Sequence, residues 1–185
     1  MPREAFSIVY ELGADQLGYF TAAQARDAGV SPMALVMMER RENVERVSHG
    51  VYRLQQFPFG PLSEYMEAVL WPIGATGVIS HESALALYGV SDANPGRIHL
   101  TLPPGHRVRR QVPARLKLHY QKLDDEDRTL FEGIPVTTMA RTIRDCRTAA
   151  VGDEILRQAL GDAEREGLVS RNDAASLRNE LEVGR

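Results

Sequence analysis

The chain has 185 residues, of which 43% are hydrophobic and 25% are charged, as in globular proteins of one or two domains. Its 22 basic and 25 acidic residues leave a net charge of −3 and exclude a strongly basic domain, so DNA binding has to be argued from local geometry. No apolar run is long enough to span a membrane, and the single cysteine, Cys146, excludes an intrachain disulfide and a cysteine zinc cluster. The start of the chain lacks the pattern of a secretory signal, so we expect a cytoplasmic protein.

The N-terminal region contains the start and stop signals of three short helices. Apolar residues predict a first helix that ends near Gly13. Thr21 and Gln24 have the spacing of a capping box, which begins a second helix that ends at Gly29. The dipeptide Ser31-Pro32 is a typical beginning for a third helix. Two short helices joined by a glycine-containing turn predict a helix-turn-helix.

Two short segments after the third helix alternate apolar and polar side chains, as half-buried strands do. They cover residues 44–47 and 51–54, and Ser48-His49-Gly50 between them has the composition of a tight turn. A hairpin that directly follows a helix-turn-helix forms a wing. We therefore predict a winged helix-turn-helix domain over residues 1–57.

Prolines and a glycine at 58–61 indicate a hinge, and residues 62–185 are expected to form a second domain. Its predicted elements are helices over 63–71 and 81–88, strands over 97–102, 116–120 and 130–136, and a helix beginning at Thr137. Residues 153–182 have the pattern of two helices. The predicted fold class is α+β, with an N-terminal winged helix-turn-helix followed by a mixed α+β domain with C-terminal helices.

The third helix, over about residues 32–42, is the candidate recognition helix, because this element of the motif enters the major groove. At about 100° per residue, turning Leu35 and Met38 inward leaves an outward face that is mostly apolar. The residues expected to contact DNA from this helix and the wing are Ser31, Met33, Val36, Met37, Arg40, Arg41, Arg46, His49 and Arg53. Apolar side chains can touch thymine methyl groups but neutralise no phosphate, so the same face also fits a protein-docking surface.

Two charged runs lie in the second domain. The densest positive run follows two prolines, and Arg107, Arg109 and Arg110 in it are candidates to contact a phosphate or an acidic partner. The favoured explanation of this run is an edge strand that its charges keep soluble. The acidic run over 124–127 is expected to be a solvated connector between strands.

No recognisable catalytic or metal-binding pattern occurs in the sequence. Four histidines lack the short spacing of zinc ligands, and we expect each of them at the surface or at the edge of the core. They are His81, His99, His106 and His119. Ser80-His81-Glu82 contains the residue types of a triad, but neighbours at a helix start do not face one another. Cys146 is expected on the inner face of its helix as a small hydrophobic residue. We therefore predict no enzymatic activity, no metal and no cofactor.

Several segments follow one another in a specific order and spacing. In chain order they are residues 21–25, 29–31, 44–54, 80–85 with Tyr88-Gly89, 97–103, 133–138 and 141–145. Together they resemble the AbiEi-family antitoxins of bacterial toxin–antitoxin systems, over nearly the whole chain. Family recognition helices usually carry several arginines where Val36 and Met37 stand here, and often a turn glycine where Glu42 stands.

The resemblance implies a transcriptional autorepressor and an antitoxin. In that family the winged domain binds inverted repeats in the operon's own promoter, and the second domain acts against a toxin that resembles a nucleotidyltransferase. A symmetric operator also implies two copies of the chain on DNA. The alternative function, in a different class, is a protein-interaction module that binds the toxin without significant DNA binding.

Overall fold

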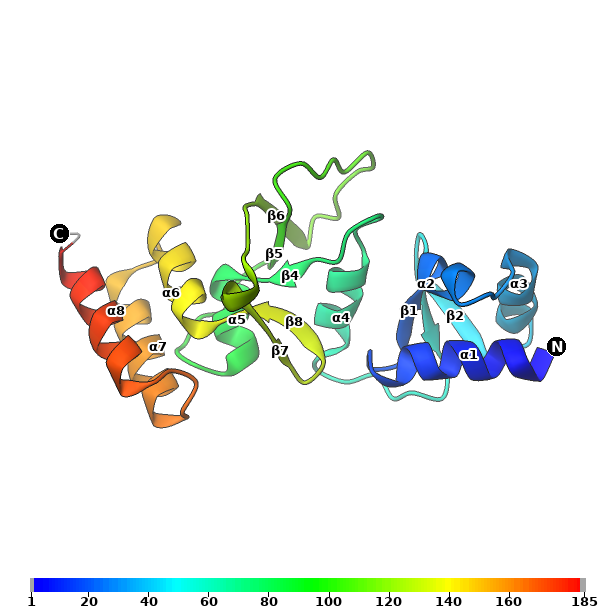
Figure 1. Ribbon diagram of the computed structural model, residues 1–185, viewed down its shortest axis with the longest axis horizontal. Coiled ribbons are helices and arrows are strands. Elements are labelled where there is room, and N and C mark those ends of the chain that lie inside the picture. The colour runs from blue at the N-terminus through cyan, green and yellow to red at the C-terminus, as the bar shows by residue number, and fades with distance from the viewer. Residues whose placement is uncertain (1, 184–185) are drawn as a thin grey trace. The chain divides into compact units, whose positions relative to one another are not determined.

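The computed structural model describes residues 2–183 (Figure 1). The chain divides into two compact units between Gly77 and Val78. The division lies later than the hinge at residues 58–61 that the sequence indicates. The reason is helix α4 (Ser63–Leu70), which packs on a strand of the first unit. The first unit therefore contains the predicted winged region and α4 as well.

The winged helix-turn-helix of the first unit is built from α1 (Pro2–Ala14), α2 (Ala22–Asp27), α3 (Pro32–Arg40) and a small sheet. Its strands are β1 (Tyr19–Thr21), β2 (Val44–Ser48) and β3 (Val51–Leu54). In this three-stranded sheet β3 lies in the middle and pairs antiparallel with both neighbours. Sequence signals predicted the helices and the hairpin. They did not predict β1, because three residues are too few to show an alternation.

The helix starts of this unit form as their sequence signals predict. The hydroxyl of Thr21 accepts a hydrogen bond from the Gln24 amide at 3.1 Å, and the Gln24 side chain accepts one from the Thr21 amide at 2.8 Å. Ser31 accepts from the amide of Ala34 at 3.2 Å and so caps α3. Gly29, between the two helices, has φ +91°, a left-handed conformation that favours glycine. These local interactions define where α2 and α3 begin and how the chain turns between them.

One apolar core holds the helices to the sheet in the first unit. Its fully or nearly buried members are Val9, Phe20, Ala25, Val30, Leu35, Met38, Val44 and Leu54. Every helix and strand of the winged region contributes at least one of them, so the position of α3 depends on the whole core.

The second unit contains a five-stranded mixed sheet with the order β6-β5-β4-β8-β7. Its strands are β4 (Val78–Ile79), β5 (Ile98–Leu102), β6 (Leu116–Tyr120), β7 (Arg128–Phe131) and β8 (Ile134–Thr137). The pairs β5–β6 and β4–β8 are parallel, and the pairs β4–β5 and β7–β8 are antiparallel. A short 3₁₀ turn, η1 (Asp125–Asp127), precedes β7 in the acidic connector.

The prediction of one strand over residues 130–136 is wrong. The segment is the hairpin of β7 and β8, because Glu132 and Gly133 both adopt positive φ, +49° and +79°, and reverse the chain. The apolar residues on both sides of this tight turn look continuous in sequence. A glutamate in a left-handed conformation carries no sequence signal for such a turn.

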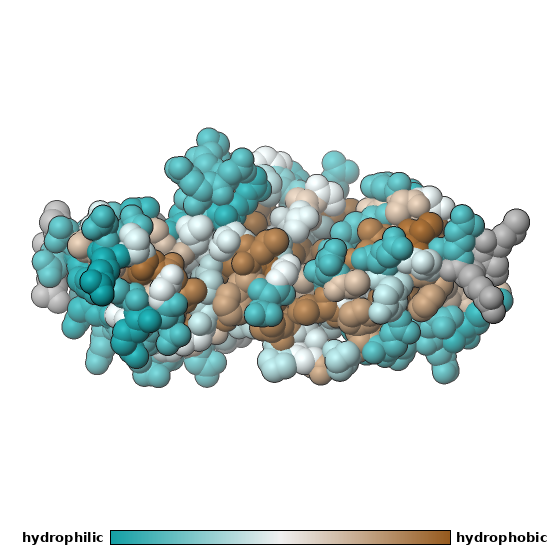
Figure 2. Space-filling model, turned by 60° about the horizontal axis from the view of Figure 1, so that its bottom comes forward, coloured by the Kyte–Doolittle hydropathy of each residue, from teal (hydrophilic) through white to brown (hydrophobic). Residues whose placement is uncertain are grey.

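Helices gather on one side of this sheet: α5 (His81–Tyr88), α6 (Met139–Thr148), α7 (Asp153–Arg165) and α8 (Arg171–Val183) (Figure 1). They share a core that includes Leu85, Ile143, Leu156, Leu160 and Leu177. In Figure 2, where α7 and α8 lie at the left end, mainly hydrophilic side chains cover their outer surface. Within residues 2–183, no helix has both the length and the apolar character needed to cross a membrane.

Candidate nucleic-acid interface

Helix α3 presents the face that the sequence predicts. Leu35 and Met38 are buried, whereas Met33 is 69% exposed, Val36 39% and Met37 38%. Arg40 and Arg41 are exposed at the C-terminal end of the helix. The surface of α3 thus has an apolar first part and a charged last part, in which Glu39 is exposed beside the two arginines.

The wing presents a second group of polar side chains. Arg46 on β2 and His49 in the turn are both exposed, and Arg46 Nη2 lies 3.0 Å from His49 Nδ1. The pairing of β2 with β3 shifts register between Arg46 and Ser48, so a bulge lies directly before the turn. Bulges increase the local twist and redirect side chains. The wing therefore ends in an arginine and a histidine held together at its tip.

Arg53 does not fit the expectation of an accessible phosphate ligand. Its side chain is only 14% exposed, and its Nε donates to Glu45 Oε1 at 2.8 Å across the hairpin. Its Nη1 donates to the Phe57 carbonyl at 3.1 Å, and the guanidinium lies 6.0 Å from the centre of the Phe59 ring. Arg53 thus ties the wing to the segment that follows it.

The other candidate residues lie in different surroundings. Ser31 is exposed, and its hydroxyl keeps a proton to donate while its oxygen caps α3. Arg107, Arg109 and Arg110 belong to the second unit, in the loop between β5 and β6, as expected for a run that follows two prolines. Cys146 is fully buried in α6, and burial raises the pKa of its thiol, which confirms the prediction of a small hydrophobic residue.

The turn after α3 contains an acid in an unusual conformation. Glu42 is exposed and has φ +56°, the left-handed region in which glycine is favoured. It lies beside the basic end of the helix. Its carboxylate therefore reduces the positive potential of a surface that would have to meet phosphates.

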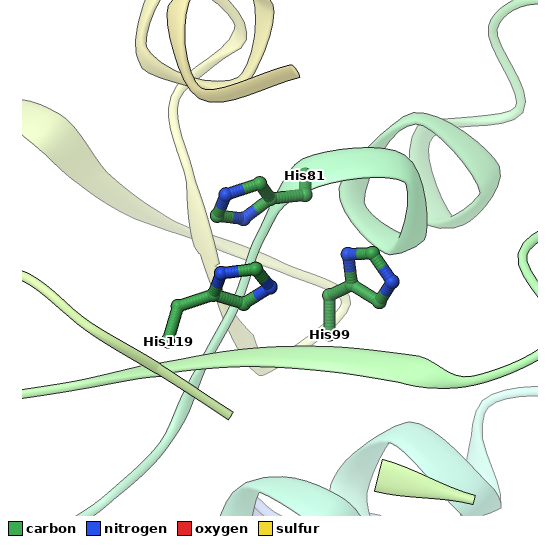
Figure 3. A group of neighbouring side chains, drawn as sticks. All are labelled: His81, His99 and His119. Carbon is green, nitrogen blue, oxygen red and sulfur yellow. The ribbon is translucent and has the colours of Figure 1, made fainter. Parts of the chain in front are cut away.

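The expectation that the histidines lie at the surface or the edge of the core is wrong for His81 and His99, which are buried. His81, His99 and His119 each offer a ring nitrogen within 4.8 Å of the others (Figure 3). The spacing along the chain gives no hint of this, because the three residues come from different elements of the sheet and its first helix. His106 lies in the loop between β5 and β6.

The expectation that Ser80 and His81 do not face each other is also wrong. His81 Nδ1 lies 2.9 Å from Ser80 Oγ, because His81 has φ +53° at the start of α5. Ser80 accordingly makes no side-chain cap of this helix. Glu82, the acidic residue of the apparent triad, lies near a different histidine, with its carboxylate 4.0 Å from His99 Nε2.

Two family models match the chain. The model described as "Transcriptional regulator, AbiEi antitoxin" matches residues 7–55, and the one described as "AbiEi antitoxin C-terminal domain" matches residues 75–183. No curated protein matches. A crystal structure of the RV2827C protein from Mycobacterium tuberculosis is similar at a TM-score of 0.52 and 17% identity, over 92% of this chain and 69% of that one. This likeness supports the fold alone.

Proposed function

The chain belongs to the AbiEi antitoxin family, and we propose that it is a DNA-binding antitoxin that represses the promoter of its own operon and neutralises a nucleotidyltransferase-like toxin. Membership in this family supports an antitoxin role in a toxin–antitoxin system. It also supports a regulatory function without enzymatic activity. The identity of the toxin and the autorepression are parts of the proposal.

The observation that carries the DNA-binding part is the exposed surface of α3 beside a hairpin with a polar tip. The first turns of a recognition helix reach base edges, and Met33, Val36 and Met37 present methyl-bearing surface there. Arg40 ends the same helix, Arg41 follows as its C-cap, and Arg46 extends from the wing, so cations are available for phosphates. We propose that the helix reads thymine-rich steps while the arginines hold the backbone.

Fluorescence anisotropy with the full chain tests this proposal. The probe is the DNA upstream of its own gene, compared with a scrambled duplex of equal length at two salt concentrations. We expect tighter binding to the upstream DNA, and weaker binding at high salt because phosphate contacts release counterions. Equal, weak binding to both duplexes would reject operator recognition.

The alternative function rests on the apolar part of α3. Met33 and Met37 also line a groove between α1 and α3, together with Phe6 and Ile8. Exposed apolar surface of this kind often binds another protein, here the toxin. Val36→Glu with Met37→Glu distinguishes the two functions, because it would abolish co-elution with the toxin on a sizing column only if this face docks the toxin. Intact co-elution with lost operator binding would support DNA recognition.

We propose that the second unit contacts the toxin or supports a homodimer on the inverted repeat. The basis is the family model for the antitoxin C-terminal domain, which covers residues 75–183. Light scattering of the full chain with and without a palindromic operator would measure the number of copies bound. Two copies per operator are expected, and one copy would reject the symmetric arrangement.

A further inference from the structure

The sheet of the second unit brings two distant histidines together by its register. On β5 and β6, which are parallel, Thr101 lies opposite His119. Side chains two residues apart point to the same face of a strand, so His99 is the diagonal neighbour of His119 on that face. The ring centres of these two histidines are 5.2 Å apart.

The third histidine arrives from β4, the other neighbour of β5. Ser80, directly after β4, donates its backbone amide to the His99 carbonyl at 3.1 Å. The chain then turns into α5 with His81 in a left-handed conformation, φ +53°. This places the His81 ring 3.7 Å from that of His119 and 5.6 Å from that of His99, centre to centre (Figure 3).

The interior of this cluster contains polar atoms without partners. His81 and His99 are 2% and 4% exposed, and His119 is half-buried. His99 Nδ1 and His119 Nε2 are buried and have no hydrogen-bond partner among residues 2–183. A buried polar atom without a hydrogen bond destabilises the fold, and two such nitrogens in one cluster favour an occupant that accepts their lone pairs.

The outer edges of the cluster are arranged to orient the rings. Ser80 Oγ lies 2.9 Å from His81 Nδ1 and accepts a hydrogen bond from Thr101 Oγ1 at 2.8 Å. The Glu82 carboxylate lies 4.0 Å from His99 Nε2, on the side of the ring away from the orphaned Nδ1. Metal-binding histidines typically have a carboxylate or another polar group behind them in this way.

Burial disfavours the protonated form of each of the three rings. Burial lowers the pKa of His81 to about 3 and that of His99 to about 4, and it lowers the pKa of His119 as well. Neighbouring histidines and the exposed Lys117 add to the effect. Neutral imidazole is the form that ligates a metal.

We propose that His81, His99 and His119 form a binding site for a divalent transition-metal ion of the zinc class, with water in the fourth position. Imidazole ligands suit zinc, copper, nickel and iron, and three histidines plus water is a known zinc arrangement. Tetrahedral zinc requires nitrogens about 3.4 Å apart. Since the His81 and His119 rings are stacked at 16°, one of them turns about its side-chain bonds on binding. The ion links β4–α5, β5 and β6 and stabilises the sheet that they share.

Zinc titration of the chelator-stripped full chain tests the site. We expect one zinc ion per chain, a higher melting temperature with zinc, and visible absorption typical of a tetrahedral site when Co²⁺ replaces zinc. His119→Ala should weaken zinc binding at least 100-fold. Glu82→Gln, which removes only the group behind His99, should weaken it by about 10-fold.

His106→Ala is the matched control, because that histidine lies in a loop outside the cluster. It should leave zinc affinity and the Co²⁺ spectrum unchanged. If the unaltered chain binds no zinc, or if His119→Ala and His106→Ala reduce binding equally, the site is rejected. Circular dichroism of the metal-free variants verifies folding, and His99→Asn replaces His119→Ala if the latter does not fold.

Discussion

Arg46 and His49 contact each other across the turn of the wing, with 3.0 Å between Arg46 Nη2 and His49 Nδ1. A guanidinium donates hydrogen bonds and accepts none, so the His49 Nδ1 is the acceptor and the ring proton is on Nε2. The tip of the wing therefore presents donor groups from both side chains. Phosphate oxygens accept from such donors, and a guanidinium that is already held loses less freedom on binding.

Arg46→Ala should weaken operator binding by removing one phosphate contact. The slope of log affinity against log salt concentration should decrease by about 1, whatever the DNA sequence. Anisotropy titrations at several salt concentrations measure both quantities. Arg157→Ala, which removes an exposed arginine from α7, is the control and should change neither. An unchanged slope in the Arg46 variant would show that the wing does not contact phosphates.

Arg53→Ala should act on stability instead of DNA affinity. The Arg53 guanidinium is largely buried against Glu45 and the Phe57 carbonyl, so its loss should lower the free energy of unfolding by about 1–2 kcal/mol. Urea denaturation measures this change, and a double-mutant cycle with Glu45→Ala isolates the pair. If the variant shows a smaller slope of log operator affinity against log salt concentration, this structural role is contradicted and Arg53 contacts DNA.

Glu42→Gly should raise both stability and DNA affinity. Glycine removes the cost of a left-handed backbone, and we expect a gain of about 0.5–1 kcal/mol in the free energy of unfolding. It also removes a negative charge beside Arg40 and Arg41. Glu42→Gln separates the two effects, because it removes the charge and keeps the strain. If Glu42→Gln binds the operator no better than the unaltered chain, the carboxylate does not weaken the interface.

Arg141→Met should destabilise the second unit by about 3 kcal/mol at neutral pH, because it leaves a buried carboxylate unpaired. Arg141 donates to Asp145 at 2.9 Å, to Asp127 at 2.7 Å and to Gln121 at 2.7 Å, and so joins the acidic connector to α6. Replacement by methionine keeps the packing of the stem. Urea denaturation at pH 7 measures the loss.

The same variant has a predictable pH dependence. Burial raises the pKa of Asp145 above its usual value, so the folded chain takes up this proton before the unfolded chain does as pH falls. Removal of Arg141 raises that pKa further. The destabilisation should therefore be largest at neutral pH and shrink as pH falls through the raised pKa of Asp145. A loss that grows on acidification would contradict this account.

The first unit could be predicted well because its signals are local. A capping box, a Ser-Pro helix start and a short alternating hairpin each involve neighbouring residues, and all of them form as expected. The outward face of α3 followed from helical periodicity alone. Arg53 was different, because its environment depends on Glu45 across the hairpin and on Phe59 beyond the wing.

The histidine cluster could not be predicted because it depends on sheet topology. His99 and His119 meet only if β5 and β6 are parallel and paired in one particular register, and His81 joins them only through β4. No short-range pattern specifies that pairing. A single residue with positive φ, His81, then decides whether its side chain points into the group.

The burial of Cys146 allows a thiol-directed probe to be attached at one chosen position of the chain. The sequence has no other cysteine, and this one is fully buried with a thiol whose pKa is raised. Thiol-directed dyes react with accessible thiolates, so the native chain should remain unlabelled. A cysteine introduced at an exposed position, such as Val36 on α3, would therefore carry a fluorophore at one defined place. Such a chain would report the approach of DNA or of a protein to that helix without any further substitution.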